Sequence, residues 1–158
     1  MSEIPLKLYK PKIRLQISEG YKFVSKVVKN NSLHTVCEEA RCPNIFECWD
    51  RGTATIMILG DICTRACGFC SVKTGKPVWN DLMEPFRTAM AVKKMNLKHV
   101  VITSVDRDDI KNDFGARIWS RTIKQIRKSA PNCSIEVLTP DFQGNVNALS
   151  IVFESKPD

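Results

Sequence analysis

The sequence predicts a mixed α/β fold with a parallel sheet, because three apolar, β-rich runs are each followed by a loop and a segment with helical spacing. Strands that alternate with helices form βαβ units, in which consecutive strands run parallel. Two of the runs, TIMIL and VVIT, are uninterrupted, which is typical of strands covered on both faces. The 158 residues, of which 43% are hydrophobic and 26% charged, suit one globular domain and exclude a disordered or collagen-like chain.

The first part of the chain is predicted to hold one short helix and a cysteine-rich loop. Residues 1–17 are basic and interrupted by prolines, so we expect an extended arm. Residues 18–31 carry apolar residues at helical spacing behind Ser18, a good N-cap residue, which predicts a helix. Residues 37–53 contain three cysteines and are predicted to be rich in loops.

The rest of the chain is predicted to form three βα units. The strands are expected at residues 54–59, 99–103 and 135–138, and the helices at residues 85–95, 116–129 and 145–154. The first of these helices opens at Glu84-Pro85, because proline favours the first helical turn. Three units can form a sheet but not a closed barrel. The chain also stops without an evident cap, so we expect a fragment of a longer chain, with a natural short protein as the alternative.

The charge and the termini limit the classes of partner. Lys and Arg number 24 against 17 Asp and Glu, which gives a net charge of +7 and favours an acidic protein partner. No aromatic residues interleave with the lysines, so we expect no nucleic acid. No run reaches the roughly 18 apolar residues of a membrane span, and no secretory signal is present, so we expect no membrane association. A reducing compartment is expected, the bacterial cytoplasm or alternatively the mitochondrial matrix.

Cysteine is the most informative residue type. The chain has seven, and six of them lie between Cys37 and Cys70. An odd number in a chain without a secretory signal argues against a disulfide framework. Such a dense cluster indicates metal binding, whereas the remote Cys133 is expected to be a bystander thiol.

The second cysteine group has a C-x3-C-x2-C spacing and directly follows the first predicted strand. It consists of Cys63, Cys67 and Cys70. Sites in α/β folds lie at the carboxyl ends of strands. Three thiolates hold three irons of a [4Fe–4S] cluster, which normally takes four cysteines, and leave one iron open to a substrate or cofactor. A structural zinc site needs four ligands, commonly as two pairs, and only one C-x2-C pair is present.

The first group has a C-x4-C-x5-C spacing and again offers three ligands. It consists of Cys37, Cys42 and Cys48. Because fourteen residues separate Cys48 from Cys63, we expect two separate clusters, with one cluster plus spare cysteines as the alternative.

Several motifs together resemble a known family. The C-x3-C-x2-C loop, with Phe69 before its last cysteine, resembles the radical S-adenosylmethionine (SAM) superfamily. The stretches CEEARCPN, ECW, MILGDICTR, VITSVDRDD and PDFQG together resemble the lipoyl synthase family, from about residue 10 to the end. The resemblance implies a partial radical SAM (β/α) barrel of about three βα units, preceded by an N-terminal helix and a cysteine-rich loop. It divides the chain into an N-terminal extension, residues 1–53, and an incomplete barrel domain, residues 54–158.

The resemblance also implies an activity, which is the insertion of two sulfur atoms at C6 and C8 of a protein-bound octanoyl chain. Cys63, Cys67 and Cys70 would hold the [4Fe–4S] cluster that binds SAM, and Cys37, Cys42 and Cys48 an auxiliary [4Fe–4S] cluster that donates sulfur. The implied partners are an octanoylated lipoyl carrier domain and reduced ferredoxin or flavodoxin. No catalytic side-chain acid or base is expected, because an alkyl C–H bond offers no proton that such a group can take, and cofactors must supply the step.

Three further residues are expected to bind SAM, namely Phe69, Ser104 and Asp106. Ser104 and Asp106 lie in the loop after the second strand, which meets the methionyl group in the superfamily. The alternative is a solvated turn in which Asp108 or Asp109 caps a helix. Arg65 and Arg107 would contact a carboxylate of the ligand or lie on the surface.

The sequence also departs from the family pattern. The auxiliary cluster's fourth ligand in the family is a serine in an Arg-Ser-Ser-Tyr motif, which is absent here, so we do not expect the chain alone to turn over. Residues 112–116, NDFGA, replace the family's Asp-Gly-Gly-Ala and are one residue longer. Three alternatives stay open: an iron–sulfur binding module, an inactive remnant, or another two-cluster radical SAM sulfur-transfer enzyme.

Overall fold

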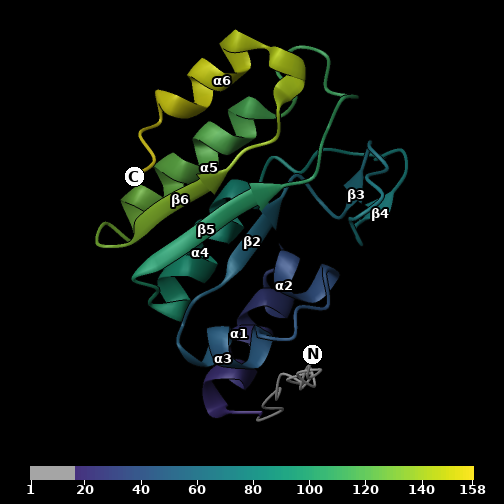
Figure 1. Cartoon of the computed structure of the whole chain (residues 1–158). Helices are drawn as coiled ribbons and strands as arrows, with labels where there is room; N and C mark the ends of the chain where they lie inside the picture. Colours follow the sequence, from purple (N-terminus) through teal and green to yellow (C-terminus); the bar gives the residue numbers. More distant parts are fainter. Residues whose placement is uncertain (1–16) are drawn as a thin grey trace, which may run out of the picture.

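The computed structural model describes residues 17–158 and confirms the α/β fold (Figure 1). A four-stranded sheet has the order β1-β2-β5-β6. Its strands are β1 (His34–Thr35), β2 (Thr55–Ile58), β5 (His99–Ser104) and β6 (Ser134–Leu138). β2, β5 and β6 run parallel, and β1 pairs antiparallel with β2. This parallel array is consistent with part of a radical SAM barrel. The predicted arm lies outside the described residues, apart from Ile17.

Three helices follow the three parallel strands, as predicted. They are α4 (Glu84–Met95), α5 (Ala116–Ser129) and α6 (Val146–Phe153). The order β2-β5-β6 follows the chain without reversal, so right-handed crossovers place the helices on one face of the sheet. α5 accordingly packs against both α4 and α6. Between β2 and α4, a small parallel pair, β3 (Ile62–Cys63) and β4 (Lys73–Thr74), stands beside the main sheet (Figure 1).

The prediction that the TIMIL and VVIT strands are covered on both faces is correct for β2 and wrong for β5, and β6, for which it was not made, is also buried on one side only. All but the first residue of β2 are buried. In β5, Val100 and Ile102 are buried, whereas Val101 and Thr103 are only half-buried. In β6 only Ile135 is buried. The reason is that the helices cover only one face along β5 and β6.

The N-terminal part is more helical than predicted. α1 (Glu19–Asn30) confirms the first helix, and the Ser18 hydroxyl caps it by accepting the Tyr21 N–H at 3.1 Å. The stretch predicted to be loop-rich instead contains α2 (Val36–Glu39) and α3 (Ile45–Asp50). Thr35 is the N-cap of α2: its hydroxyl accepts the Glu38 N–H at 3.2 Å and donates to the Glu38 carboxylate at 3.1 Å. This T-x-x-E signal was readable in the sequence.

One continuous core joins the N-terminal helices to the sheet. Trp49 of α3 is fully buried and stacks on Tyr21 of α1, with ring centroids 5.2 Å apart. Trp119 of α5 is equally buried. Within residues 17–158, no helix is both long enough and apolar enough to cross a membrane.

Candidate metal centre

The second cysteine group occupies a loop that is closed at its base. Cys63 ends β3 and pairs with Thr74 of β4, and the Gly75 N–H donates to the Cys63 carbonyl at 2.9 Å. Within the loop, the Cys70 N–H donates to the Cys67 carbonyl at 3.0 Å, which forms a turn. The three cysteines therefore lie on one short loop beyond the carboxyl end of β2.

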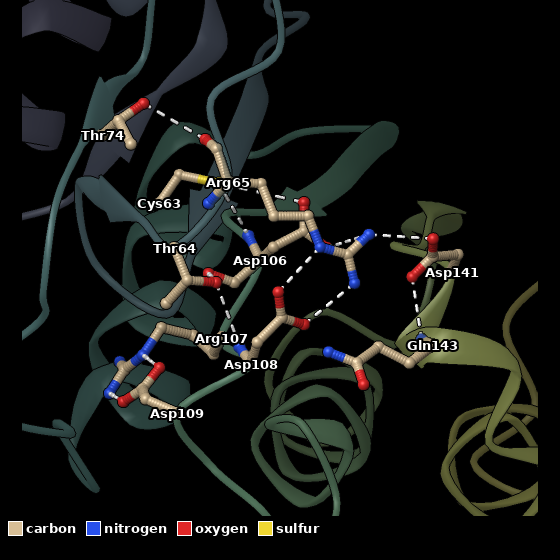
Figure 2. A network of polar contacts seen from close by, with 10 residues as sticks. All are labelled: Cys63, Thr64, Arg65, Thr74, Asp106, Arg107, Asp108, Asp109, Asp141 and Gln143. Atoms are coloured by element: carbon tan, nitrogen blue, oxygen red, sulfur yellow. Dashed lines mark hydrogen bonds and ion pairs between the residues drawn. The ribbon is translucent and has the colours of Figure 1, made fainter.

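Cys63 is anchored to the neighbouring loop through its sulfur. Its side chain is buried, and its Sγ accepts the backbone N–H groups of Arg65 at 3.5 Å and Asp106 at 3.4 Å (Figure 2). The Asp106 carboxylate lies 3.8 Å from the same sulfur. N–H donors orient a cysteine sulfur and tune a cluster that it binds. Cys67 and Cys70, in contrast, are exposed.

The donor set fits an iron–sulfur cluster. Among residues 17–158, no three His, Cys, Asp or Glu side chains converge on a point where one metal ion would sit. A [4Fe–4S] cluster bonds each thiolate to a different iron, so its ligands need only surround the cluster. One anchored sulfur and two accessible ones on the same loop meet that requirement.

Arg65, inside the second cysteine group, binds the loops that follow β5 and β6. Its Nε and Nη2 donate to the two carboxylate oxygens of Asp108 at 2.8 and 2.9 Å, and its Nη1 donates to Asp141 at 2.8 Å (Figure 2). Asp106 lies 3.6 Å from Nη1. Thr64 adds two bonds, since its hydroxyl donates to the Asp106 carbonyl and accepts the Asp108 N–H, each at 3.1 Å. Three βα loops are thus tied together around the cysteine loop.

This ion-pair network shifts the acidity of its members. The hydrogen bonds from Arg65 hold the pKa of Asp108 at about 2, and the same contacts raise the pKa of Arg65. Burial raises the pKa of Asp106, although Arg65 opposes the shift. Arg65 is therefore neither a free surface residue nor available to a ligand carboxylate, because the protein's own carboxylates already accept its hydrogen bonds.

Arg107 also has an internal role. Its guanidinium is 4% exposed, donates to both carboxylate oxygens of Asp109 at 2.8 Å, and donates to the Leu59 carbonyl at 3.2 Å. The alternative in which Asp108 or Asp109 caps a helix is wrong, because both carboxylates are engaged by arginines. Asp113 instead accepts the N–H groups of Gly115 and Arg117 at the start of α5.

The three predicted SAM contacts are placed in different surroundings. Asp106 lies beside Cys63, as described above. Ser104 ends β5, and its hydroxyl accepts the Trp119 indole N–H at 3.2 Å. Phe69 is 94% exposed. Their roles toward SAM stay predictions.

The first cysteine group lies on the N-terminal helices. Cys37 is in α2, Cys42 follows in the turn, and Cys48 is in α3. The Cys42 N–H donates to the Cys37 carbonyl at 3.0 Å, and all three side chains are half-buried. Burial raises the pKa of Cys48, and the proximity of Cys37 and Cys42 raises it further. The three cysteines thus lie on two short helices and the turn between them, and three thiols are a donor set that an iron–sulfur cluster takes.

Sequence reasoning missed Glu84, which it treated only as a helix start. Its carboxylate is 4% exposed and accepts the N–H groups of Leu59 at 2.7 Å and Gly60 at 3.2 Å. Burial raises its pKa. The only available signal was an acidic residue in the first turn of a helix, which cannot reveal a contact 25 residues away along the chain.

No family model matches the chain. Curated relatives do: the lipoyl synthases of Rubrobacter xylanophilus and Symbiobacterium thermophilum are each 54% identical over 147 residues, and that of Shouchella clausii is 53% identical over 148 residues. Each alignment covers 93% of this chain and 46–48% of the relative. The chain thus spans about half the length of the curated relatives it matches. By this identity over nearly all of its residues, it is a homologue of the N-terminal part of lipoyl synthase.

Proposed function

We propose that this chain supplies the cluster-binding part of a lipoyl synthase, which inserts two sulfur atoms at C6 and C8 of a protein-bound octanoyl chain. One observation carries the proposal: both three-cysteine groups occur in a chain 53–54% identical to lipoyl synthases, one of them at the carboxyl end of a parallel strand.

In this proposal the second group holds the cluster that binds SAM. The ligands are Cys63, Cys67 and Cys70. When bound, the cluster and SAM supply the radical chemistry that an alkyl C–H bond requires. The chain's own residues position these groups: the Arg65 and Asp106 N–H groups orient the Cys63 sulfur, and the Arg65 ion pairs fix the surrounding loops. Ser104, Asp106 and Phe69 are the proposed contacts to SAM.

The first group is proposed to hold the auxiliary cluster that donates sulfur. The ligands are Cys37, Cys42 and Cys48. The N-terminal extension, residues 1–53, would then present the sulfur source, and residues 54–158 the site of radical formation. The proposed partners are an octanoylated lipoyl carrier domain and reduced ferredoxin or flavodoxin. The proposed location is the bacterial cytoplasm, with the mitochondrial matrix as the alternative.

The test is anaerobic reconstitution with iron and sulfide, followed by metal analysis and EPR of the reduced chain. We expect Ala substitution of either cysteine group to remove about half of the iron, because each group holds its own cluster. Added SAM should change the EPR signal only when Cys63, Cys67 and Cys70 are present. Cys133→Ala is the matched control and should behave as wild type.

Two results would contradict the proposal. Iron content that stays unchanged after replacement of either group would rule out the assignment of two clusters. A loaded chain whose EPR signal does not respond to SAM would instead be an iron–sulfur binding module.

A further inference from the structure

The chain leaves β2 through a backbone kink that leads to the second cysteine group. Leu59 has φ +70° and Gly60 has φ +91°, so two consecutive residues are in the left-handed region. This conformation costs a non-glycine residue energy and persists only when its surroundings enforce it. Cys63 follows three residues after the kink, so the direction of the kink decides where its sulfur lies.

Three features enforce the kink from different sides. The Glu84 carboxylate accepts both consecutive N–H groups, at 2.7 Å from Leu59 and 3.2 Å from Gly60. Arg107 donates to the Leu59 carbonyl at 3.2 Å. The Leu59 side chain packs against Gly115, where an added Cβ would lie 2.5 Å from Leu59 Cδ1. Of these, Glu84 alone binds both kinked residues.

We propose that Glu84 is a positioning residue for the iron–sulfur site: its buried carboxylate holds the Leu59–Gly60 kink and so sets the place of Cys63. Its own side chain does not reach the cysteines through any described contact, and it acts through the backbone. Cys63 then meets the N–H groups of Arg65 and Asp106 that orient its sulfur. This role deepens the proposed function and rests on it for the link to iron, but the link from Glu84 to Cys63 does not depend on iron.

The first arm of the test therefore uses the iron-free chain. Glu84→Gln keeps the shape of the side chain but turns an amide NH2 toward one of the two N–H donors. Gly60→Ala strains the same kink from the other side, since its φ is +91° and the added methyl meets nothing within 4 Å. Alkylation of Cys63 is followed by mass spectrometry. The remote Cys133, which is also buried, is the internal reference, and Glu154→Gln is the control variant.

We expect both kink variants to speed alkylation of Cys63 by at least about tenfold and to leave the rate at Cys133 unchanged. In Glu84→Gln the reason is the loss of one charge-assisted hydrogen bond, and in Gly60→Ala it is the strain of a non-glycine residue in the left-handed region. If the two thiols accelerate together, the substitutions act through general unfolding and the proposal is wrong. An unchanged Cys63 rate in folded Glu84→Gln would also overturn it. If Glu84→Gln does not fold, Gly60→Ala still tests whether the kink places Cys63, and an unchanged Cys63 rate in that variant overturns the proposal.

The second arm follows iron loss to a chelator after reconstitution. It uses two parent variants, each of which keeps one of the two cysteine groups and has the three cysteines of the other group replaced by Ala; we call them single-group backgrounds. Glu84→Gln should accelerate iron loss about tenfold from Cys63, Cys67 and Cys70 and leave the other group unaffected. Equal acceleration in both backgrounds would overturn the positioning role. If the variant that keeps only the second cysteine group, with Glu84 unchanged, takes up no iron, the proposed function fails. The alkylation result still decides whether Glu84 controls the place of Cys63.

Discussion

Asp108→Asn should lower the stability of the chain at neutral pH and flatten its dependence on pH in acid. Asp108 receives two parallel hydrogen bonds from Arg65, at 2.8 and 2.9 Å, and these hold its pKa at about 2 instead of 3.8. A carboxyl group with a lowered pKa in the folded state binds fewer protons when folded than when unfolded. Its stabilisation is therefore present above the unfolded pKa and is lost as the pH falls toward about 2.

The magnitude follows from the two pKa values. The gap between 3.8 and about 2 corresponds to about 2.4 kcal/mol at 1.36 kcal/mol per pKa unit. The side chains of Arg65 and Asp108 are 28% and 23% exposed, so solvent screens part of this interaction. We expect the wild type to lose about 1–2 kcal/mol through Asp108 between about pH 5 and pH 2.

The assay is urea unfolding of the reduced, iron-free chain at several pH values from neutral to acid, for wild type and Asp108→Asn. The quantity compared is the difference between the two free energies of unfolding, in which the carboxyl groups that do not contact Arg65 cancel. It should shrink steadily as the pH falls. Glu154→Gln, at the exposed end of α6, is the control and should track the wild type. A difference that stays constant from neutral to acid pH would refute the ion pair as the source of the stability.

Three further substitutions test the packing and the caps by the same unfolding assay. Gly115→Ala should cost about 1–3 kcal/mol, because φ is +88° and the new Cβ would overlap the Leu59 side chain; a neutral effect would show that Leu59 moves aside freely. Thr35→Ala should cost about 1 kcal/mol by removing the N-cap of α2, and Thr35→Ser should restore it; equal losses would exclude the cap as the cause. Trp119→Phe should cost about 1–3 kcal/mol, since it leaves a void and deprives Ser104 of its N–H donor, and stability equal to wild type would argue against this packing.

The fold was largely predictable because its signals are local. Residues 116–129 were predicted as a helix and form α5 with the same bounds. The strand predicted at 54–59 ends one residue early, at Ile58, because Leu59 adopts a left-handed conformation that Glu84 enforces. An apolar residue at the end of an apolar run carries no sign of such a contact. α2 was missed for a different reason, since its T-x-x-E signal was present and outweighed by the cysteines and proline around it.

The sequence singles out the proposed ligands of the site but not the residues that support them. Cysteine spacing marks both groups, because metal ligands on one loop must lie close in sequence. Arg65 and its partner Asp141 are 76 residues apart, so only the meeting of parallel strand ends brings them together. Sequence spacing offers no measure of that distance, and Arg65 was accordingly expected to face a ligand or the solvent.

The two cysteine groups are held by different kinds of contact, which has a consequence for their stability. Cys37, Cys42 and Cys48 depend on short helices, the Thr35 N-cap and the local packing of Trp49. The second group depends on contacts from α4 and from the loops after β5 and β6. Effects of substitutions at separate sites without shared partners are usually independent. Thr35→Ala should therefore speed iron loss from the first group alone and Glu84→Gln from the second alone, measured in the single-group backgrounds. If either substitution speeds iron loss from both groups, the common core, and not these local contacts, controls how firmly iron is held.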